Sequence, residues 1–390
     1  MLTVKLKKGA ERRILIGHPW VFSNELERLE EKPQAGSDVR VADWRGAFIG
    51  RGYINPHSLI AVRLLWRRDQ EPDGLFIRRR VEQALALRRR LYPGETTYRL
   101  INSEGDGLPG AVVDRFGDTL VVSTTTAGME LRKGWLIEAL GDLVEPAQIY
   151  LKNDSPVRAL EGLTDYTEWL LGGERPEVAI EQDGLAFTVD VVGGQKTGFF
   201  LDQRPARQLV SPWASGLRVL DAFCYTGAFG LYAARAGATE VVGVESSPQA
   251  ASRARLHAEA NALGDKVSIL EGDAWEVLKG LHAQGERFGL VVLDPPSFAR
   301  SKKDLKEATV AYERLNRLAM KLLEAGGVLS TSTCSYHVDE ATFRRCVLKA
   351  ASGLKRSCAW LASGGQGPDH PTPLAMSEGR YLTTLLARVG

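Results

Sequence analysis

Short apolar segments alternate with longer helical patterns in the second half of the chain. The apolar segments are 218–223, 240–245, 267–273, 288–294 and 326–333. An uninterrupted apolar run is typical of a strand buried on both faces, and strands that alternate with helices pair in parallel. The pattern therefore predicts a Rossmann-like α/β domain over residues 189–390, with helices on both faces of a parallel sheet.

The first half of the chain follows two other patterns. Segments rich in β-forming residues, with turn residues between them, predict a small β-barrel over 1–72, with strands at 39–43, 47–54 and 59–65. Mixed patterns predict a central α+β domain over 73–188. Its expected elements are a helix at 75–92, a hairpin at 111–123, a helix near 129–140, and strands near 148–152 and 178–192. We therefore expect a multi-domain α/β protein.

The composition is that of a folded protein outside the membrane. Of 390 residues, 44% are hydrophobic and 25% are charged, which excludes wholesale disorder. No apolar run approaches the roughly 18–20 residues that cross a membrane, and the first residues lack the apolar stretch of a secretory signal. The cysteines form no C-x-x-C pair, so neither a metal site nor a disulfide framework is predicted. We expect a soluble, cytoplasmic protein without membrane contacts.

Charge is unevenly distributed along the chain. Residues 1–90 hold 19 Lys and Arg against 11 Asp and Glu, a net charge of +8, and the remainder holds 31 against 37, a net charge of −6. A basic first part is typical of proteins that bind a polyanion such as RNA. The alternative is a solvated helix face, because the arginine triplets 78–80 and 88–90 lie at helical spacing.

The turn after the first strand of the predicted sheet indicates a nucleoside cofactor, since ligands of such sheets bind at the carboxyl ends of the strands. The turn runs Asp221-Ala222-Phe223-Cys224-Tyr225-Thr226-Gly227 and lacks the G-x-G-x-x-G pattern that binds a dinucleotide pyrophosphate. An acid with one early glycine suits a ligand that has an ammonium group and no phosphate, such as S-adenosylmethionine. The predicted contacts are Asp221, Phe223, Tyr225 and Gly227. The alternative is a plain strand–helix connection.

Further cofactor contacts are predicted after the next two strands and before the sheet. Glu245 ends the second strand, where an acid can accept hydrogen bonds from ribose hydroxyls, although NAD enzymes place an acid similarly. The third strand ends at Asp273, where an adenine edge can be read. The glycine-rich loop 193–204 can fold over the cofactor, although Asp202 and Arg204 also fit an ordinary helix start. The predicted contacts of these segments are Glu245, Ser246, Asp273, Ala274, Phe199 and Gln203. Asp294, at the end of the fourth strand, is also predicted to contact the cofactor.

The fourth and fifth strands end in the predicted catalytic residues. Asp294-Pro295-Pro296-Ser297-Phe298 forms a rigid exit whose acid and carbonyls can hold the polar edge of a planar base. The fifth strand is followed by Cys334, and a thiolate there can activate cytosine by adding to carbon 6. The alternative is a packed, neutral cysteine. Cys224 is the rival thiol, and Cys346 and Cys358 fit core positions.

Together these segments resemble the RlmI/RlmO-type large-subunit ribosomal RNA cytosine-5 methyltransferases over the whole chain. The resemblance rests on the runs 196–204 (Lys-Thr-Gly-Phe-Phe-Leu-Asp-Gln-Arg), 294–298, 333–335 and 221–227. Gly17-His18-Pro19-Trp20-Val21-Phe22 resembles the opening of the family's PUA domain, an RNA-binding barrel.

The resemblance implies formation of 5-methylcytosine in 23S rRNA, with S-adenosylmethionine as cofactor and Cys334 as nucleophile. It implies the large ribosomal subunit or its precursor as partner, and a homodimer is compatible with it. The position occupied by a second cysteine in many RNA cytosine-5 methyltransferases is Pro296 here. Two alternatives stay open: an rRNA guanine (N7 or N2) methyltransferase without a nucleophile, and a non-catalytic RNA-binding assembly factor. The absence of a G-x-G-x-x-G pattern argues against a nicotinamide-dependent dehydrogenase.

Overall fold

The computed structural model describes residues 2–299 and 301–390. Contacts within the chain divide it into two compact units. The first unit contains the residues up to 180, 189–201 and 368–379, and the second contains 181–188, 202–367 and 380–390. The predicted boundaries of three domains stay a prediction. Among the described residues, no helix has the length and apolar character needed to span a bilayer.

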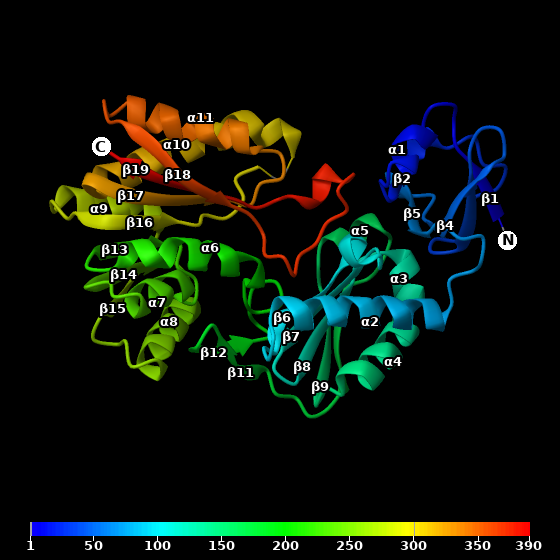
Figure 1. Cartoon of the computed structure of the whole chain (residues 1–390), viewed down its shortest axis with the longest axis horizontal. Coiled ribbons are helices and arrows are strands. Elements are labelled where there is room, and N and C mark those ends of the chain that lie inside the picture. The colour runs from blue at the N-terminus through cyan, green and yellow to red at the C-terminus, as the bar shows by residue number, and fades with distance from the viewer. Residues whose placement is uncertain (1, 300) are drawn as a thin grey trace. The chain divides into compact units, whose positions relative to one another are not determined.

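The first unit begins with a five-stranded sheet in the order β1-β3-β4-β5-β2 (Figure 1). Its strands are β1 (Leu2–Lys5), β2 (Trp20–Phe22), β3 (Asp38–Ala42), β4 (Phe48–Ile54) and β5 (Ile60–Trp66), with the short helix α1 (Glu11–Leu15). The three predicted strands are β3, β4 and β5 and are confirmed within one residue. Their apolar side chains, together with those of β1 and α1, form a separate buried cluster.

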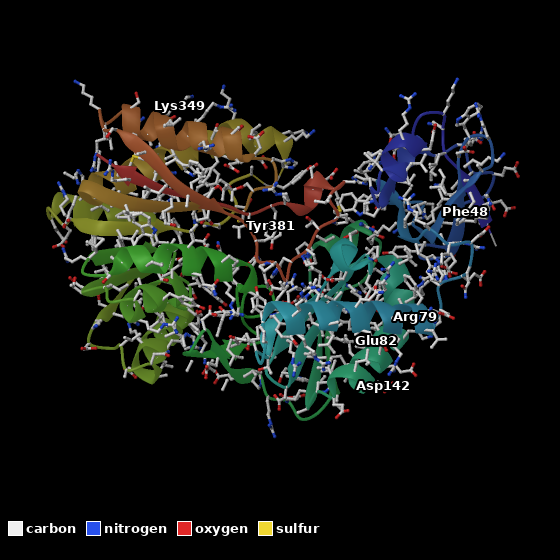
Figure 2. The ribbon with its side chains drawn as sticks, in the orientation of Figure 1. Phe48, Arg79, Glu82, Asp142, Lys349 and Tyr381 are labelled. Atoms are coloured by element: carbon white, nitrogen blue, oxygen red, sulfur yellow. The ribbon has the colours of Figure 1, made fainter. Side chains whose placement is uncertain are left out.

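A second sheet of the first unit has the order β10-β9-β8-β7-β6. Its strands are β6 (Thr97–Asn102), β7 (Ala111–Phe116), β8 (Thr119–Thr124), β9 (Gln148–Asn153) and β10 (Tyr166–Leu171). The helices are α2 (Gly74–Leu91), α3 (Ala127–Leu131), α4 (Lys133–Val144) and α5 (Val157–Leu160). Long helices α2 and α4 lie side by side and share a core with the sheet (Figure 1). Arg79 and Glu82 project from α2, and Asp142 projects from α4 (Figure 2).

Three predictions about this region need correction. The single helix expected near 129–140 is two helices, because the chain leaves helical geometry at Arg132, whose guanidinium bonds to the Gly128 carbonyl and pairs with Asp38. Strands β6 and β10 were not predicted. The strand expected at 178–192 is a hairpin, β11 (Glu177–Gln182) and β12 (Leu185–Asp190), which turns at Asp183 and Gly184.

Buried ion pairs connect segments of the first unit. Arg63 of β5 pairs with Glu104 (2.8 Å) and Glu161 (3.4 Å), which belong to segments around the second sheet. Arg88 of α2 is fully buried, binds both carboxylate oxygens of Asp106, and donates to the carbonyl of Asp369. Arg88 is therefore not part of a solvated helix face, and that interpretation of the second arginine triplet is wrong for this residue.

The second unit is built on a seven-stranded sheet in the order β15-β14-β13-β16-β17-β19-β18. Its strands are β13 (Arg218–Ala222), β14 (Glu240–Glu245), β15 (Val267–Glu271), β16 (Phe288–Leu293), β17 (Leu323–Thr333), β18 (Cys358–Gly364) and β19 (Thr383–Val389). The helices are α6 (Arg204–Val210), α7 (Ala228–Arg235), α8 (Pro248–Ala260), α9 (Ala274–Ala283), α10 (Leu305–Leu322) and α11 (Glu340–Ser352). All five predicted strands are confirmed, and so is the Rossmann-like architecture.

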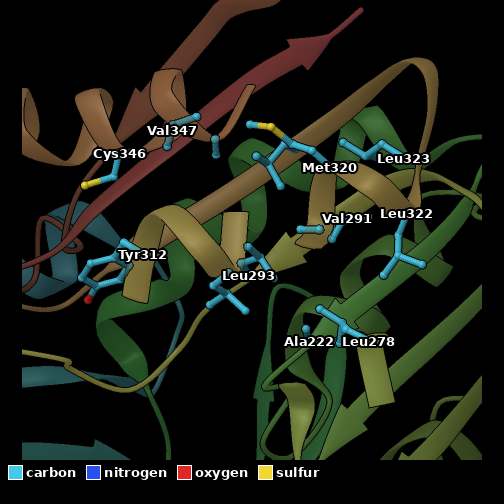
Figure 3. Close-up of a cluster of buried hydrophobic side chains, with 14 of the residues drawn as sticks. Ala222, Leu278, Val291, Leu293, Tyr312, Met320, Leu322, Leu323, Cys346 and Val347 are labelled. Atoms are coloured by element: carbon cyan, nitrogen blue, oxygen red, sulfur yellow. The ribbon is translucent and has the colours of Figure 1, made fainter. Parts of the chain in front are cut away.

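Helices cover both faces of this sheet. α9, α10 and α11 cover one face, and α7 and α8 cover the other (Figure 1). Figure 3 shows the core beneath the first group, where Val291 and Leu293 of β16 meet Tyr312 and Met320 of α10. The sheet is not parallel throughout, because β19 pairs antiparallel with both β17 and β18. The five predicted strands β13–β17 pair in parallel as expected, and the antiparallel edge is formed with β18 and β19, which were not predicted.

We predict that Gly128→Ala destabilises the first unit. A Cβ at residue 128 lies 2.1 Å from the ring of Tyr53, which is fully buried and hydrogen-bonded to Pro109 and Thr126. Because neither the ring nor α3 has room to move, we expect a loss of about 1–3 kcal/mol, measured by urea unfolding.

Gly141→Ala is the matched control, since residue 141 lies inside α4 and its Cβ meets nothing within 4 Å. We expect this variant to gain about 0.5–1 kcal/mol from helix propensity alone. Equal unfolding midpoints for the two variants would contradict the packing argument.

Candidate active site

The strand order of the second unit brings the predicted site residues to one edge of its sheet. β13 pairs in parallel with β14 on one side and with β16 on the other, and β16 pairs in parallel with β17. The chain therefore reverses its direction of winding at β13, and such a switch point leaves room for a ligand beyond the carboxyl ends. The predicted residues at these ends are Asp221, Glu245, Asp273, Asp294 and Cys334.

The turn after β13 has an unusual backbone. Phe223 and Tyr225 have φ angles of 64° and 50°, in the left-handed region, and Gly227 has φ 81°. Left-handed geometry at a residue other than glycine costs on the order of 1–3 kcal/mol and is concentrated at functional sites. Hydrogen bonds hold the turn in place: Cys224 N donates to the Val244 carbonyl (3.0 Å) and Tyr225 N donates to Glu245 Oε2 (2.9 Å).

Asp221 is a buried acid with one open oxygen. Its Oδ2 accepts a hydrogen bond from Gly230 N (2.8 Å), whereas its Oδ1 accepts none within the part of the chain that the structure describes. Burial, and secondarily the charge of Asp294, raise the pKa of Asp221 to about 7. A buried carboxylate with an unused acceptor is costly unless a cation or donor binds it. The position therefore fits the ammonium group of a ligand such as S-adenosylmethionine.

Glu245 and Asp273 have local roles besides any ligand contact. Glu245 Oε2 holds the turn at Tyr225, and its Oε1 accepts from Ser247 N (2.8 Å), at the start of α8. Ser246 is exposed beside it. Asp273 Oδ1 caps α9 by accepting from Trp275 N (2.9 Å) and Glu276 N (3.2 Å), and Ala274 is the first residue of that helix. Both acids are thus fixed in position by the backbone of the helix that follows their strand.

Gln203 lies next to Asp294 at this edge. Its Nε2 donates to Asp294 Oδ1 (2.7 Å), and its buried Oε1 accepts no hydrogen bond from the described residues. Gln203 and Asp294 belong to two motifs that are far apart in the sequence, and the structure brings these two residues into contact. Phe199 is buried within the first unit, and its role in cofactor binding stays a prediction.

Asp202 lies in the short turn before α6, and Arg204 is the first residue of that helix. Tyr381 OH donates to Asp202 Oδ2 (2.6 Å), and Arg204 pairs with Asp183. Both side chains thus connect α6 to other segments of the second unit.

Cys334 follows the last residue of β17 and is half-buried. Its two neighbours are hydrogen-bonded to Tyr312 of α10: Thr333 Oγ1 lies 2.7 Å from the hydroxyl and Ser335 Oγ lies 3.0 Å from it. Ser335 Oγ also lies 2.9 Å from Ser297 Oγ, in the Asp-Pro-Pro-Ser-Phe segment. The network fixes the backbone on both sides of Cys334 and links it to the end of β16.

Burial disfavours the thiolate form of the other three cysteines. Cys224 is buried, and burial together with Asp221 and Glu245 raises its pKa well above the usual value. Burial also raises the pKa of Cys346, which packs in the core under α11, and of Cys358, on the edge strand β18. Since the thiolate is the reactive form of cysteine, these environments favour the neutral thiol.

Comparisons with known proteins agree with this architecture. Residues 4–67 match the PUA-like domain family, and residues 163–349 match the S-adenosylmethionine-dependent methyltransferase family. The chain is 41% identical over 387 residues to ribosomal RNA large subunit methyltransferase I of Photobacterium profundum, covering 97% of each chain. It is also 41% identical over 396 residues to the protein of the same name from Shewanella denitrificans, covering 100% of this chain and 99% of the relative.

Solved structures show the same fold at lower identity. A candidate S-adenosylmethionine-dependent methyltransferase from Streptococcus mutans matches with a TM-score of 0.84 at 21% identity, and the candidate methyltransferase SMU.776, solved with SAH, matches with 0.87 at 22% identity. Both matches cover 100% of each chain. Given the sheet order, the methyltransferase match and the full-length identity, the chain is an S-adenosylmethionine-dependent methyltransferase and belongs to the ribosomal RNA large subunit methyltransferase I family.

Proposed function

We propose that this protein forms 5-methylcytosine in the large-subunit (23S) ribosomal RNA through a covalent bond between Cys334 and the cytosine. The large-subunit RNA is the substrate in the names of its relatives. The observation that carries the choice of cytosine is the position of Cys334, a half-buried thiol at the carboxyl end of β17, one strand from Asp294. A methyl transfer to a guanine nitrogen needs no such thiol.

The cofactor contacts proposed here surround the β13 turn. Asp221 Oδ1 would accept from the ammonium group, and Glu245 would accept from the ribose hydroxyls. Phe223, Tyr225 and Gly227 would shape the turn, Ser246, Asp273 and Ala274 would lie along the nucleoside, and Gln203 and Phe199 would belong to the covering loop. When bound, S-adenosylmethionine supplies an electrophilic methyl group from its sulfonium. The open oxygen of Asp221 supports this assignment.

Carbon 5 of cytosine is not nucleophilic by itself, and the role of Cys334 is to activate it. The thiolate adds to carbon 6, and the electron pair of the 5,6 double bond becomes available at carbon 5 for the methyl group. The carbon-5 proton then leaves to water, the double bond re-forms, and the sulfur–carbon 6 bond breaks. Atoms and charge balance, and the thiolate is regenerated.

Asp294 would hold the base during these steps. Its carboxylate can accept a hydrogen bond from the exocyclic amino group of cytosine, and the two prolines that follow keep this exit of β16 rigid. Gln203 donates to Asp294 Oδ1 and thereby helps to fix the orientation of the carboxylate. The hydrogen bonds of Ser297 and Ser335 keep the base-binding and nucleophile segments in register.

We predict that Cys334→Ala abolishes methyl transfer, with a loss of at least roughly 10³-fold, because carbon 5 of cytosine is no longer activated. The measurement is transfer of labelled methyl to large-subunit RNA from a strain that lacks this gene, followed by nucleoside analysis. Cys358→Ala, a half-buried cysteine on the edge strand, is the matched control and should retain activity.

The same measurement separates the alternatives. Label in a guanine that is indifferent to Cys334→Ala would replace the cytosine proposal with a guanine methyltransferase. Absence of any transfer, with S-adenosylmethionine unbound, would favour an RNA-binding assembly factor.

A second prediction concerns the covalent bond itself. RNA that carries 5-fluorocytidine at the target should form a complex with the wild-type protein that survives denaturing gels, because fluorine cannot leave carbon 5 as the proton does and the thiolate stays attached. The complex should require S-adenosylmethionine and be absent in Cys334→Ala. A complex of equal yield in that variant would assign the nucleophile to another residue.

A third prediction follows from the pKa of Asp221, which is about 7 in the folded protein. Below pH 7 the carboxyl is largely neutral, and an ammonium group that binds it stabilises the charged form and lowers the pKa. Binding of S-adenosylhomocysteine at pH 6.5 should therefore release protons, and the release should vanish toward pH 8.5, where the group is already ionised.

Calorimetry in buffers of different ionisation enthalpy measures this release. Asp221→Asn keeps the shape but cannot ionise, so the pH-dependent part of the release should disappear in it. Identical proton release in the two proteins would show that Asp221 does not meet the ammonium group.

A further inference from the structure

A cavity of about 510 Å3 in the first unit is lined by positive charge. It lies where the end of β5 meets the first turns of α2. Two arginines that follow β5 and two of α2 line it, together with two aromatic rings: Trp66, Arg67, Arg68, Phe76, Arg79 and Arg80. The ring centroids of Trp66 and Phe76 are 4.7 Å apart in an edge-on arrangement, so the aromatic wall is packed rather than loose.

The four arginines have no carboxylate partner among the described residues. Arg68 and Arg79 form no ion pair or hydrogen bond there, Arg67 donates to the carbonyl of Ile14, and Arg80 donates to Gln83 Oε1 (3.3 Å). Arg80 also lies over the ring of Phe76, 5.2 Å from its centroid. Burial lowers the pKa of Arg67 and of Arg80. The charge of Asp106 also acts on Arg80, but that carboxylate is already paired with Arg88. Among the described residues, the positive charge of Arg68 and Arg79 is therefore not neutralised by an ion pair.

The single acid in the lining does not change this conclusion. Glu104 accepts from Arg63 (2.8 Å) and from the indole of Trp20 (2.7 Å), so its charge is already paired. Arg78, next to Arg79 along α2, is unlike Arg79 because its charge is paired with Glu82 and Asp142. Figure 2 shows Arg79 on the same helix as Glu82. The first arginine triplet is thus divided between one neutralised residue and two that face the cavity.

We propose that this cavity binds the sugar–phosphate backbone of the RNA substrate, with Arg68 and Arg79 as phosphate contacts and the half-buried Trp66 as a surface on which a base can stack. A guanidinium binds two phosphate oxygens at once, and aromatic or arginine planes stack on unpaired bases. The inference rests on the proposed function, since it takes RNA as the polyanion. It goes further, because Arg68, Arg79 and Arg80 lie outside the PUA-like match at 4–67. The RNA-binding surface therefore continues onto α2.

The test compares two double variants that remove the same charge from the same region. Arg68→Ala/Arg79→Ala removes two exposed arginines that line the cavity and have no partner among the described residues. Arg89→Ala/Arg90→Ala removes two exposed arginines of α2 that do not line it. Neither pair makes contacts on which folding depends, and unchanged melting and S-adenosylhomocysteine affinity would confirm that both variants are folded.

Binding is measured with a large-subunit RNA fragment that contains the methylated position, over a series of salt concentrations. The cavity variant should bind on the order of tenfold more weakly at 0.15 M salt, and its log K against log salt slope should fall by about 1.4–1.8, for two lost phosphate contacts. In methyl transfer it should raise KM for RNA and leave kcat unchanged at saturating RNA. The Arg89→Ala/Arg90→Ala protein should match the wild type in RNA affinity, in the salt slope and in KM for RNA.

Equal weakening of RNA binding in both double variants would overturn the proposal, since RNA would then respond to surface charge in general and not to the cavity. Unchanged binding of the cavity variant would overturn it as well. Failure of the proposed function is recognised separately, by a wild-type protein that binds the fragment but forms no 5-methylcytosine in it.

Discussion

The pairing of β13 with β14 on one side and β16 on the other determines most of what this protein can do. All of these pairs are parallel, so every carboxyl end points to the same edge. The edge collects acids from the ends of four strands and a thiol from the end of a fifth, although these residues are far apart in the sequence. The antiparallel strands β18 and β19 extend the sheet beyond β17 without disturbing that edge. Cys334 therefore directly follows a strand that is paired on both sides.

The site contains buried polar atoms without hydrogen-bond partners among the described residues and backbone conformations that are energetically unfavourable. Asp221 is buried with an open oxygen, Gln203 has a buried carbonyl without a donor among the described residues, and two residues of the β13 turn are left-handed. Each of these features costs free energy. The surrounding core, with β16 packed against α10, supplies the rigidity that maintains them. A ligand that satisfies these groups would thus stabilise the second unit as it binds.

The sequence predicted the parts of the fold that depend on local pattern. Uninterrupted apolar runs located β13 to β17, because strands buried on both faces leave a signal that does not depend on their partners. The edge strand β18 is partly exposed, so its sequence lacks a clear hydrophobic pattern. Its pairing with β19 cannot be predicted from the residues of β18 alone. The positions of Asp221 and Cys334 followed from the rule for carboxyl ends, whereas the left-handed geometry at Phe223 and Tyr225 had no sequence signal, since neither residue is a glycine. Likewise, the burial of Arg88 depends on Asp106 and Asp369, which no periodicity connects to it.

The contact between Arg88 and Asp369 also bears on how the chain is made. Residues 368–379 belong to the first unit, and besides Arg88 they meet β6, where Arg99 N donates to Asp369 Oδ2 (2.9 Å) and Asn102 donates to the Pro371 carbonyl (2.9 Å). During synthesis the first unit is thus incomplete until nearly the whole second unit has left the ribosome. Until residues 368–379 are made, Arg88 has the Asp106 carboxylate and the Arg99 carbonyl as partners and lacks the Asp369 carbonyl. Domains can fold one after another as they emerge, but the first unit can reach its final state only after residues 368–379 have emerged.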